Sequence, residues 1–88
     1  MKLKYNFVVN EVAGKKVAVA VGEDLAKFNG FIKMNENSAF VFEQLKNDVT
    51  EDDIIAALVK EFGVEDNDEL REGVRGFIAG LNAEGVLE

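Results

Sequence analysis

The chain has 88 residues, of which 48% are hydrophobic, and a net charge of −7. This length allows one domain with a single modest core. The chain has no histidine and no cysteine, which excludes imidazole bases, thiol nucleophiles, disulfides and the common zinc sites. No signal-peptide pattern opens the sequence, and the longest apolar run, residues 17–21, is too short to cross a bilayer. We therefore expect a soluble, cytoplasmic protein with no membrane contact.

The charge is distributed unevenly along the chain. Residues 1–34 carry six lysines against three acids, a net +3, whereas residues 35–88 carry four cations against fourteen acids, a net −10. Nucleic-acid binding depends on neutralising phosphates with lysine and arginine, so we do not expect an acidic chain to bind nucleic acid. The composition therefore favours peptide, protein or small-molecule partners.

The first third of the sequence has the two-residue period of β-strands. Residues 2–9 alternate, with apolar side chains at Leu3, Tyr5, Phe7 and Val9. Ala13 and Gly14 predict a turn, after which valines alternate with smaller residues over 17–21 as a second strand. A polar segment with a turn signal at Asn29 and Gly30 leads to a short third strand, residues 31–34. Short connections favour an antiparallel three-stranded meander.

After residue 34 the apolar period becomes helical. Asn35 is expected to cap a first helix that ends at residues 47–48, and Thr50 a second helix that Gly63 stops. A third helix is predicted from residue 67 or 68 to Glu84. The fold class is therefore α+β: a single domain over residues 1–88, with a three-stranded antiparallel sheet followed by a three-helix bundle, compatible with a winged helix-turn-helix.

Three glycines, Gly73, Gly76 and Gly80, lie inside the third predicted helix. Each costs the helix roughly 1 kcal/mol relative to alanine. Either something approaches the helix closely there, or the helix packs tightly on the first helix.

Three stretches together suggest a family: residues 30–42, the Thr50-capped segment 50–54, and the tail 77–87. Their hydrophobic strand end, capped helices and final glycine-hydrophobic pair, in this order and spacing, resemble the PqqD family over nearly the whole chain. Phe42 stands where many members have tryptophan, and residues 47–49 replace a common Asp-Gly. The first change keeps an aromatic core residue and the second alters a loop.

The resemblance implies a non-catalytic module that recognises ribosomally made precursor peptides. In the family, the leader segment of the precursor adds as a strand to the third β-strand, against the third helix. The module then presents the peptide to a modifying enzyme, often a radical SAM protein. No cofactor or metal is implied.

The predicted peptide site combines this strand with one face of the third helix. On the strand, Phe31 and Lys33 point one way and Ile32 and Met34 the other. The helix residues that share a face are Arg71, Val74, Arg75 and Ile78. We expect Val74, Ile78 and part of Phe31 to give apolar pockets, and the three cations to meet acidic leader residues.

Each of these assignments has an ordinary structural alternative. Arg71 and Arg75 could pair with Asp68, Glu72 or other nearby acids. Val74 and Ile78 could belong to the core, and Lys33 could protect an edge strand from aggregation. Dimerisation through the exposed sheet edge is also open.

Other functions have weaker support in the sequence. A winged-helix architecture invites DNA binding or a general protein-interaction role, but the third helix is acidic. No pair of carboxylates falls in an expected pocket, so we predict no enzyme activity. A calcium loop begun at Asp66 would need glycine and an acid where Arg71 and Phe77 stand.

Overall fold

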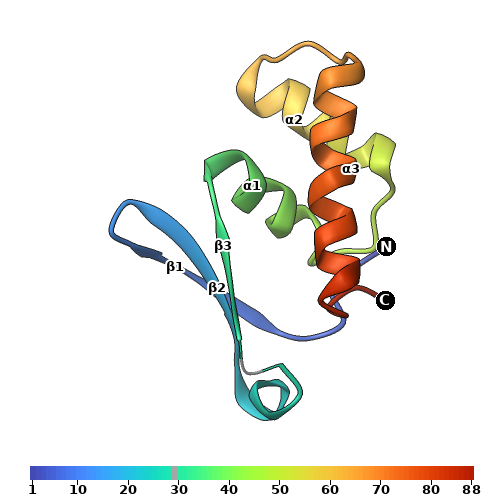
Figure 1. Ribbon diagram of the computed structural model, residues 1–88. Coiled ribbons are helices and arrows are strands. Elements are labelled where there is room, and N and C mark those ends of the chain that lie inside the picture. The colour runs from blue at the N-terminus through green and yellow to red at the C-terminus, as the bar shows by residue number, and fades with distance from the viewer. Residues whose placement is uncertain (29) are drawn as a thin grey trace.

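The computed structural model describes residues 1–28 and 30–88 and has three strands, a 3-10 helix and three α-helices (Figure 1). In chain order these are β1 (Phe7–Val12), β2 (Lys15–Ala20), η1 (Gly22–Ala26), β3 (Phe31–Met34), α1 (Glu36–Gln44), α2 (Glu51–Phe62) and α3 (Asp68–Ala83). The predicted α+β order is confirmed. Asn29, half of one predicted turn, lies outside the described residues. No helix in the described part of the chain is both long and apolar enough to cross a membrane.

The sheet is an antiparallel meander in the order β1-β2-β3, as predicted. The β1–β2 turn has Ala13 and Gly14 at φ values of 52° and 79°. Two successive positive φ values are typical of the tight hairpin turns whose twist matches that of paired strands. β3 pairs with β2 along one edge and is therefore an outermost strand.

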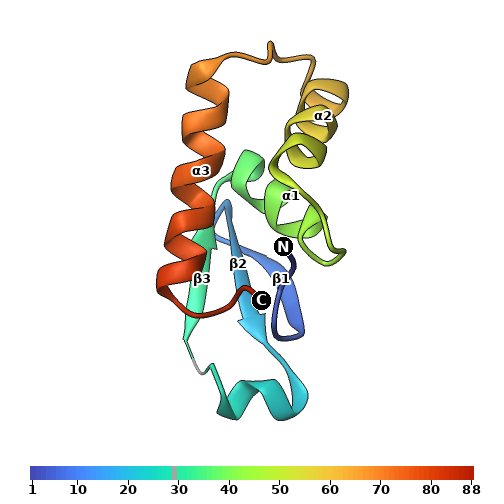
Figure 2. The ribbon, with the colours of Figure 1, turned by 90° about the vertical axis from the view of Figure 1, so that its right-hand side faces the viewer.

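The first strand begins later than the sequence predicted. Residues 2–5 keep the alternation of buried and exposed side chains, but their backbone pairs elsewhere. Leu3 forms a β-bridge with Leu87, and the Lys4 amide donates to the Val86 carbonyl at 2.7 Å. The two ends of the chain consequently lie side by side (Figures 1 and 2). Residues 2–5 alternate between buried and exposed side chains whether they form a single β-bridge or a strand. The alternation in the sequence therefore placed the start of the first strand too early.

The buried face of β2 is its alanine face. Ala18 and Ala20 are 0% and 2% exposed, whereas the valines between and beside them face the other way. α1 contacts both β2 and β3. Small side chains let a helix lie close to the sheet, so the alanines determine how near α1 sits.

The helix boundaries follow local capping signals. The Asn35 side chain accepts a hydrogen bond from the Ser38 amide at 2.8 Å, and Thr50 forms a reciprocal capping box with Asp53. Gly63 ends α2 with a φ of 65°. These three predictions are confirmed, whereas α1 ends at Gln44, earlier than predicted.

The core lies between the inner face of the sheet and the helical half of the chain, in which α1 contacts β2 and β3 and α2 lies beyond α1, away from the sheet (Figure 2). Phe42 is fully buried. Its ring meets Phe7 of β1 edge to face, with centroids 5.3 Å apart. An aromatic side chain at this position therefore joins α1 to the sheet.

The glycines inside α3 do not pack tightly on α1. A Cβ added at Gly73, Gly76 or Gly80 would meet no atom within 4 Å outside the local helix backbone. The explanation of these glycines by tight packing on the first helix is therefore wrong, and the space beside each of them is open in the described structure.

Because Gly76 is exposed and helical, Gly76→Ala should stabilise the fold by about 0.5–1 kcal/mol. Urea denaturation followed by circular dichroism measures this change. The matched control is Gly63→Ala, which should destabilise the fold because Gly63 has a left-handed φ of 65°. A loss of stability in Gly76→Ala would contradict the assignment of open space.

Candidate functional site

The free edge of β3 is the first element of the candidate site. β3 pairs with β2 from Phe31 to Met34, so its opposite edge has no strand partner among the described residues. An unpaired edge presents a row of amide and carbonyl groups that can pair with another extended chain. This edge can therefore bind a peptide through the backbone, without any catalytic group.

The side chains of β3 divide between the two faces of the sheet as predicted. Met34 is buried and Ile32 is half-buried on the helix side. Phe31 is 59% exposed on the opposite face, and the Lys33 ammonium lies 5.7 Å from its ring centroid. A strand added beside β3 would likewise alternate, so its side chains would meet the helix side and the outer face in turn.

A hollow of about 510 Å³ begins where β3 ends. Asn35, the residue after β3, and the first turn of α1 form one wall. The first half of α3 and the end of α2 form the others. The apolar part of its lining consists of Val41, Leu58, Phe62, Val64, Leu70, Val74 and Phe77. This hollow can receive apolar side chains of a segment that runs past the end of β3.

The hollow uses a different face of α3 from the one predicted. Val74 is shared by both, but Leu70, Gly73 and Phe77 line the hollow. The helical period of the sequence places Leu70 and Phe77 on an apolar face of α3. The period does not reveal that part of this face is left uncovered by the other helices. The signal that the sequence does contain is Gly73, because a glycine inside a helix often marks close approach.

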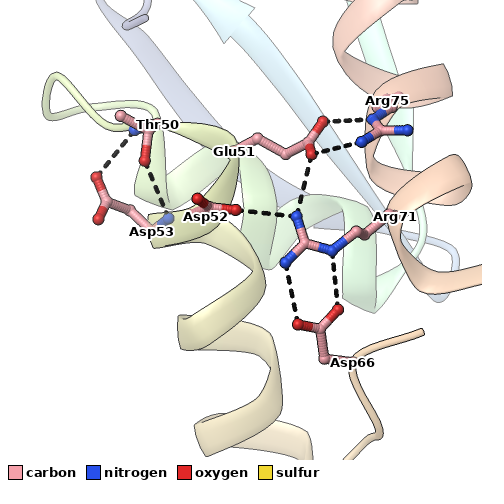
Figure 3. Close-up of polar contacts among 7 residues, drawn as sticks. All are labelled: Thr50, Glu51, Asp52, Asp53, Asp66, Arg71 and Arg75. Atoms are coloured by element: carbon pink, nitrogen blue, oxygen red, sulfur yellow. Dashed lines mark hydrogen bonds and ion pairs between the residues drawn. The ribbon is translucent and has the colours of Figure 1, made fainter. Parts of the chain in front are cut away.

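Arg71 and Arg75 lie in a cluster that joins α3 to the start of α2 (Figure 3). Arg71 binds Asp66 with two hydrogen bonds, of 2.9 and 3.0 Å, and its remaining nitrogen donates to both Glu51 and Asp52. Arg75 donates to both oxygens of Glu51 at 2.7 and 3.0 Å. These paired contacts have the fork geometry that favours arginine over lysine. The cluster therefore fixes α3 relative to α2.

The cluster changes the ionisation of its members. A hydrogen bond from Arg75 holds the pKa of Glu51 below its ordinary value of 4.5. Arg71 lowers the pKa of Asp66 below 3.8 in the same way, and the acids in turn raise the pKa of Arg71. The charged forms of all these groups are thus favoured in the folded chain.

The lowered pKa values predict an acid-dependent loss of stability. Because Glu51 and Asp66 bind protons less readily in the folded state, their contribution is complete above their unfolded pKa values and is lost as pH falls below about 4. Thermal unfolding between pH 7 and pH 3 measures this. Glu51→Gln should lose less stability than the original chain between pH 5 and pH 3. Equal losses would show that the ionisation of Glu51 makes no contribution.

The structure brings the strand residues and the arginines to different places. Lys33 lies on the outer face of the sheet, whereas Arg71 and Arg75 extend to the first turn of α2, and neither arginine lines the hollow. Arg75 remains 62% exposed and Arg71 only 26%. Ile78 is half-buried against the core. A single positive groove formed by all three cations is therefore not assembled in the structure.

The comparisons with known proteins agree with the sequence motifs. The family described as "Coenzyme PQQ synthesis protein D (PqqD)" matches residues 15–87. The chain belongs to the PqqD family. The predicted resemblance is confirmed, and the matched range of this PqqD-family chain includes β2, β3 and all three α-helices.

One solved structure supports the same fold for this PqqD-family chain. It is described as "TbiB1 in Complex with the TbiA(beta) Leader Peptide", and it is similar with a TM-score of 0.73 and 16% identity. The similarity covers 100% of this chain and 95% of the other. No curated protein sequence matches the chain.

Proposed function

We propose that this chain is a non-catalytic adaptor that binds the leader segment of a ribosomally synthesised precursor peptide and presents it to a modifying enzyme. The observation that carries the proposal is the unpaired edge of β3, a strand that is followed directly by Asn35 in the wall of the hollow beside α3. Membership of the PqqD family supports it. The similar fold of TbiB1, described in complex with a leader peptide, supports it further.

In the proposed complex the leader forms a fourth strand beside β3. Its backbone pairs with residues 31–34, which gives affinity without depending on the peptide's sequence. Its alternate side chains meet Ile32 on the helix side and Phe31 or Lys33 on the outer face. Met34 is buried, so it takes part through its backbone.

The α3 part of the proposed site has two roles. Val74 and the half-buried Ile78 support the apolar side of the site, with Val74 at the wall of the hollow. Arg71 and Arg75 fix the position of α3 through Glu51, Asp52 and Asp66. Direct contact between these arginines and acidic leader residues stays a prediction, and Arg75, the more exposed of the two, is the better placed for it.

The partner enzyme in this proposal is a radical SAM protein, which is what the family resemblance implies. The adaptor would act in the cytoplasm, where ribosomal peptides are made. DNA binding has less support, because both cations of α3 are engaged by acids.

The proposal is tested by titrating the isotopically labelled chain with the leader segment of each candidate short precursor peptide encoded in the neighbouring genes. Saturable binding should shift the amide resonances of residues 31–34 and of the α3 residues around the hollow. A scrambled leader of the same composition is the control. If none of these candidate leader segments binds, the proposed function is wrong.

A further inference from the structure

The face of the sheet turned away from the helices is apolar over most of its length. We call it the outer sheet face, and its residues are Val8, Asn10, Val12, Lys15, Val17, Val19, Phe31 and Lys33. The pairing places Val8 opposite Val19, and Val19 opposite Phe31, so one apolar row crosses all three strands. Val12 and Phe31 are 58% and 59% exposed. A continuous exposed patch of this kind is typical of an interaction surface.

The charge of the outer sheet face is opposite to that of the whole chain. Its charged residues are Lys15 and Lys33, and none of its described strand positions holds an acid, although the chain carries a net −7. Lys33 lies over the ring of Phe31 and so borders the apolar row directly. This surface is complementary to an apolar patch that is surrounded by acidic residues.

We propose that the outer sheet face docks the peptide-modifying enzyme, through an apolar, acid-rimmed surface of that enzyme. This inference rests on the proposed function. β3 links the two sites, because its free edge would pair with the leader while Phe31 and Lys33 belong to the outer sheet face. A strand added to that edge extends the same face. An enzyme bound there would therefore touch both the adaptor and the emerging peptide.

Two other occupants fit the charges less well. Two copies of the chain packed through this face would bring Lys15 and Lys33 of each copy into one interface to which the outer sheet face supplies no acid. An anionic membrane would attract the lysines but repel a chain of net −7. The crosslinking and sedimentation experiments below distinguish a second copy of the chain and a membrane from the enzyme.

The first step identifies the protein that touches the face. The photo-crosslinking residue benzoylphenylalanine replaces Val12 in cells that naturally make the chain, and it replaces Lys60, an exposed residue of α2, as the control. We expect a peptide-modifying enzyme, identified by mass spectrometry, to crosslink from Val12 and not from Lys60. Crosslinks to a second copy of the chain, or no crosslink, would overturn the proposal.

The second step measures affinity with the purified enzyme. Val8→Thr combined with Val12→Thr removes apolar surface while keeping β-branched residues, and Lys15→Glu reverses one charge. Each change should weaken binding of the enzyme about tenfold or more. Lys60→Glu is the charge-matched control and should change this affinity less than about twofold. Unchanged affinity in the outer-face variants would overturn the proposal.

Leader binding is measured on the same variants to separate the two proposals. None of the replaced residues belongs to the proposed peptide site, so leader affinity should be unchanged. If the leader binds but the outer-face changes leave enzyme affinity intact, this inference fails while the proposed function stands. If no leader binds but the enzyme still depends on the face, the proposed function fails. Sedimentation of the chain with vesicles of equal phosphatidylglycerol and phosphatidylcholine would overturn the choice of a protein partner.

Discussion

Gly73→Leu should weaken leader binding about a hundredfold and at the same time stabilise the fold. Gly73 lines the hollow, and a Cβ built there meets no atom within 4 Å, so a side chain can start at this position and a leucine would extend into the hollow. Leucine is a better helix former than glycine by about 0.8 kcal/mol. The substitution thus fills the space proposed for the peptide while it improves α3.

Two measurements on the same protein test this pair of opposite effects. We expect leader affinity to fall by about a hundredfold, as for the loss of a central anchor, while the urea midpoint rises. The matched control is Gly76→Leu, which gives the same gain in helix propensity at a position outside the hollow. If Gly73→Leu binds the leader as tightly as Gly76→Leu does, the hollow is not part of the peptide site.

Glu51→Ala should weaken leader binding about tenfold, although Glu51 lies on α2 and does not line the hollow. Glu51 binds both arginines of α3, so its removal frees Arg75 and leaves Arg71 paired with α2 through Asp52 alone. The position of α3 relative to β3 would then be less well fixed, and the bound geometry would cost more conformational entropy to form.

A double-mutant cycle with Arg75 distinguishes positioning from direct contact. If Arg75 acts through Glu51, Arg75→Ala weakens binding as Glu51→Ala does, and the double variant is no worse than either single one. If Arg75 instead contacts an acidic leader residue, Glu51→Ala should strengthen binding because it frees the guanidinium. That second result would favour the contact predicted from the sequence. Asp53→Ala, which removes half of the capping box, controls for general weakening of α2.

Local signals in the sequence were sufficient to place most of the helices and strands. Asn35 and Thr50 cap helices through hydrogen bonds that span three residues, so their role depends on nearby sequence alone. The start of β1 depends instead on Leu87, which bridges Leu3 from the other end of the chain. No local pattern contains that pairing, and the predicted boundary was accordingly wrong.

The candidate site was predictable only where it depends on local signals in the sequence. The free edge of β3 follows from the meander order, which short connections favour. The arginine partners do not follow, because Glu51 and Asp52 reach Arg71 from another helix, whereas sequence neighbours such as Glu72 are the ones a helical repeat suggests. The hollow depends on which apolar residues stay uncovered, and that is decided only when α1, α2 and α3 pack together.

The alanine face of β2 has a consequence for any strand that joins the sheet. Sliding β2 by one residue would turn its valines toward α1, where Ala18 and Ala20 now fit, and overfilling a core costs roughly 1–3 kcal/mol. The alanines thus lock the alignment of β2, and through it that of β3. A leader paired with β3 would join a sheet whose two faces are fixed in this way. The two buried alanine methyl groups would then determine which β3 side chains the leader meets on the helix side of the sheet and which on its outer face.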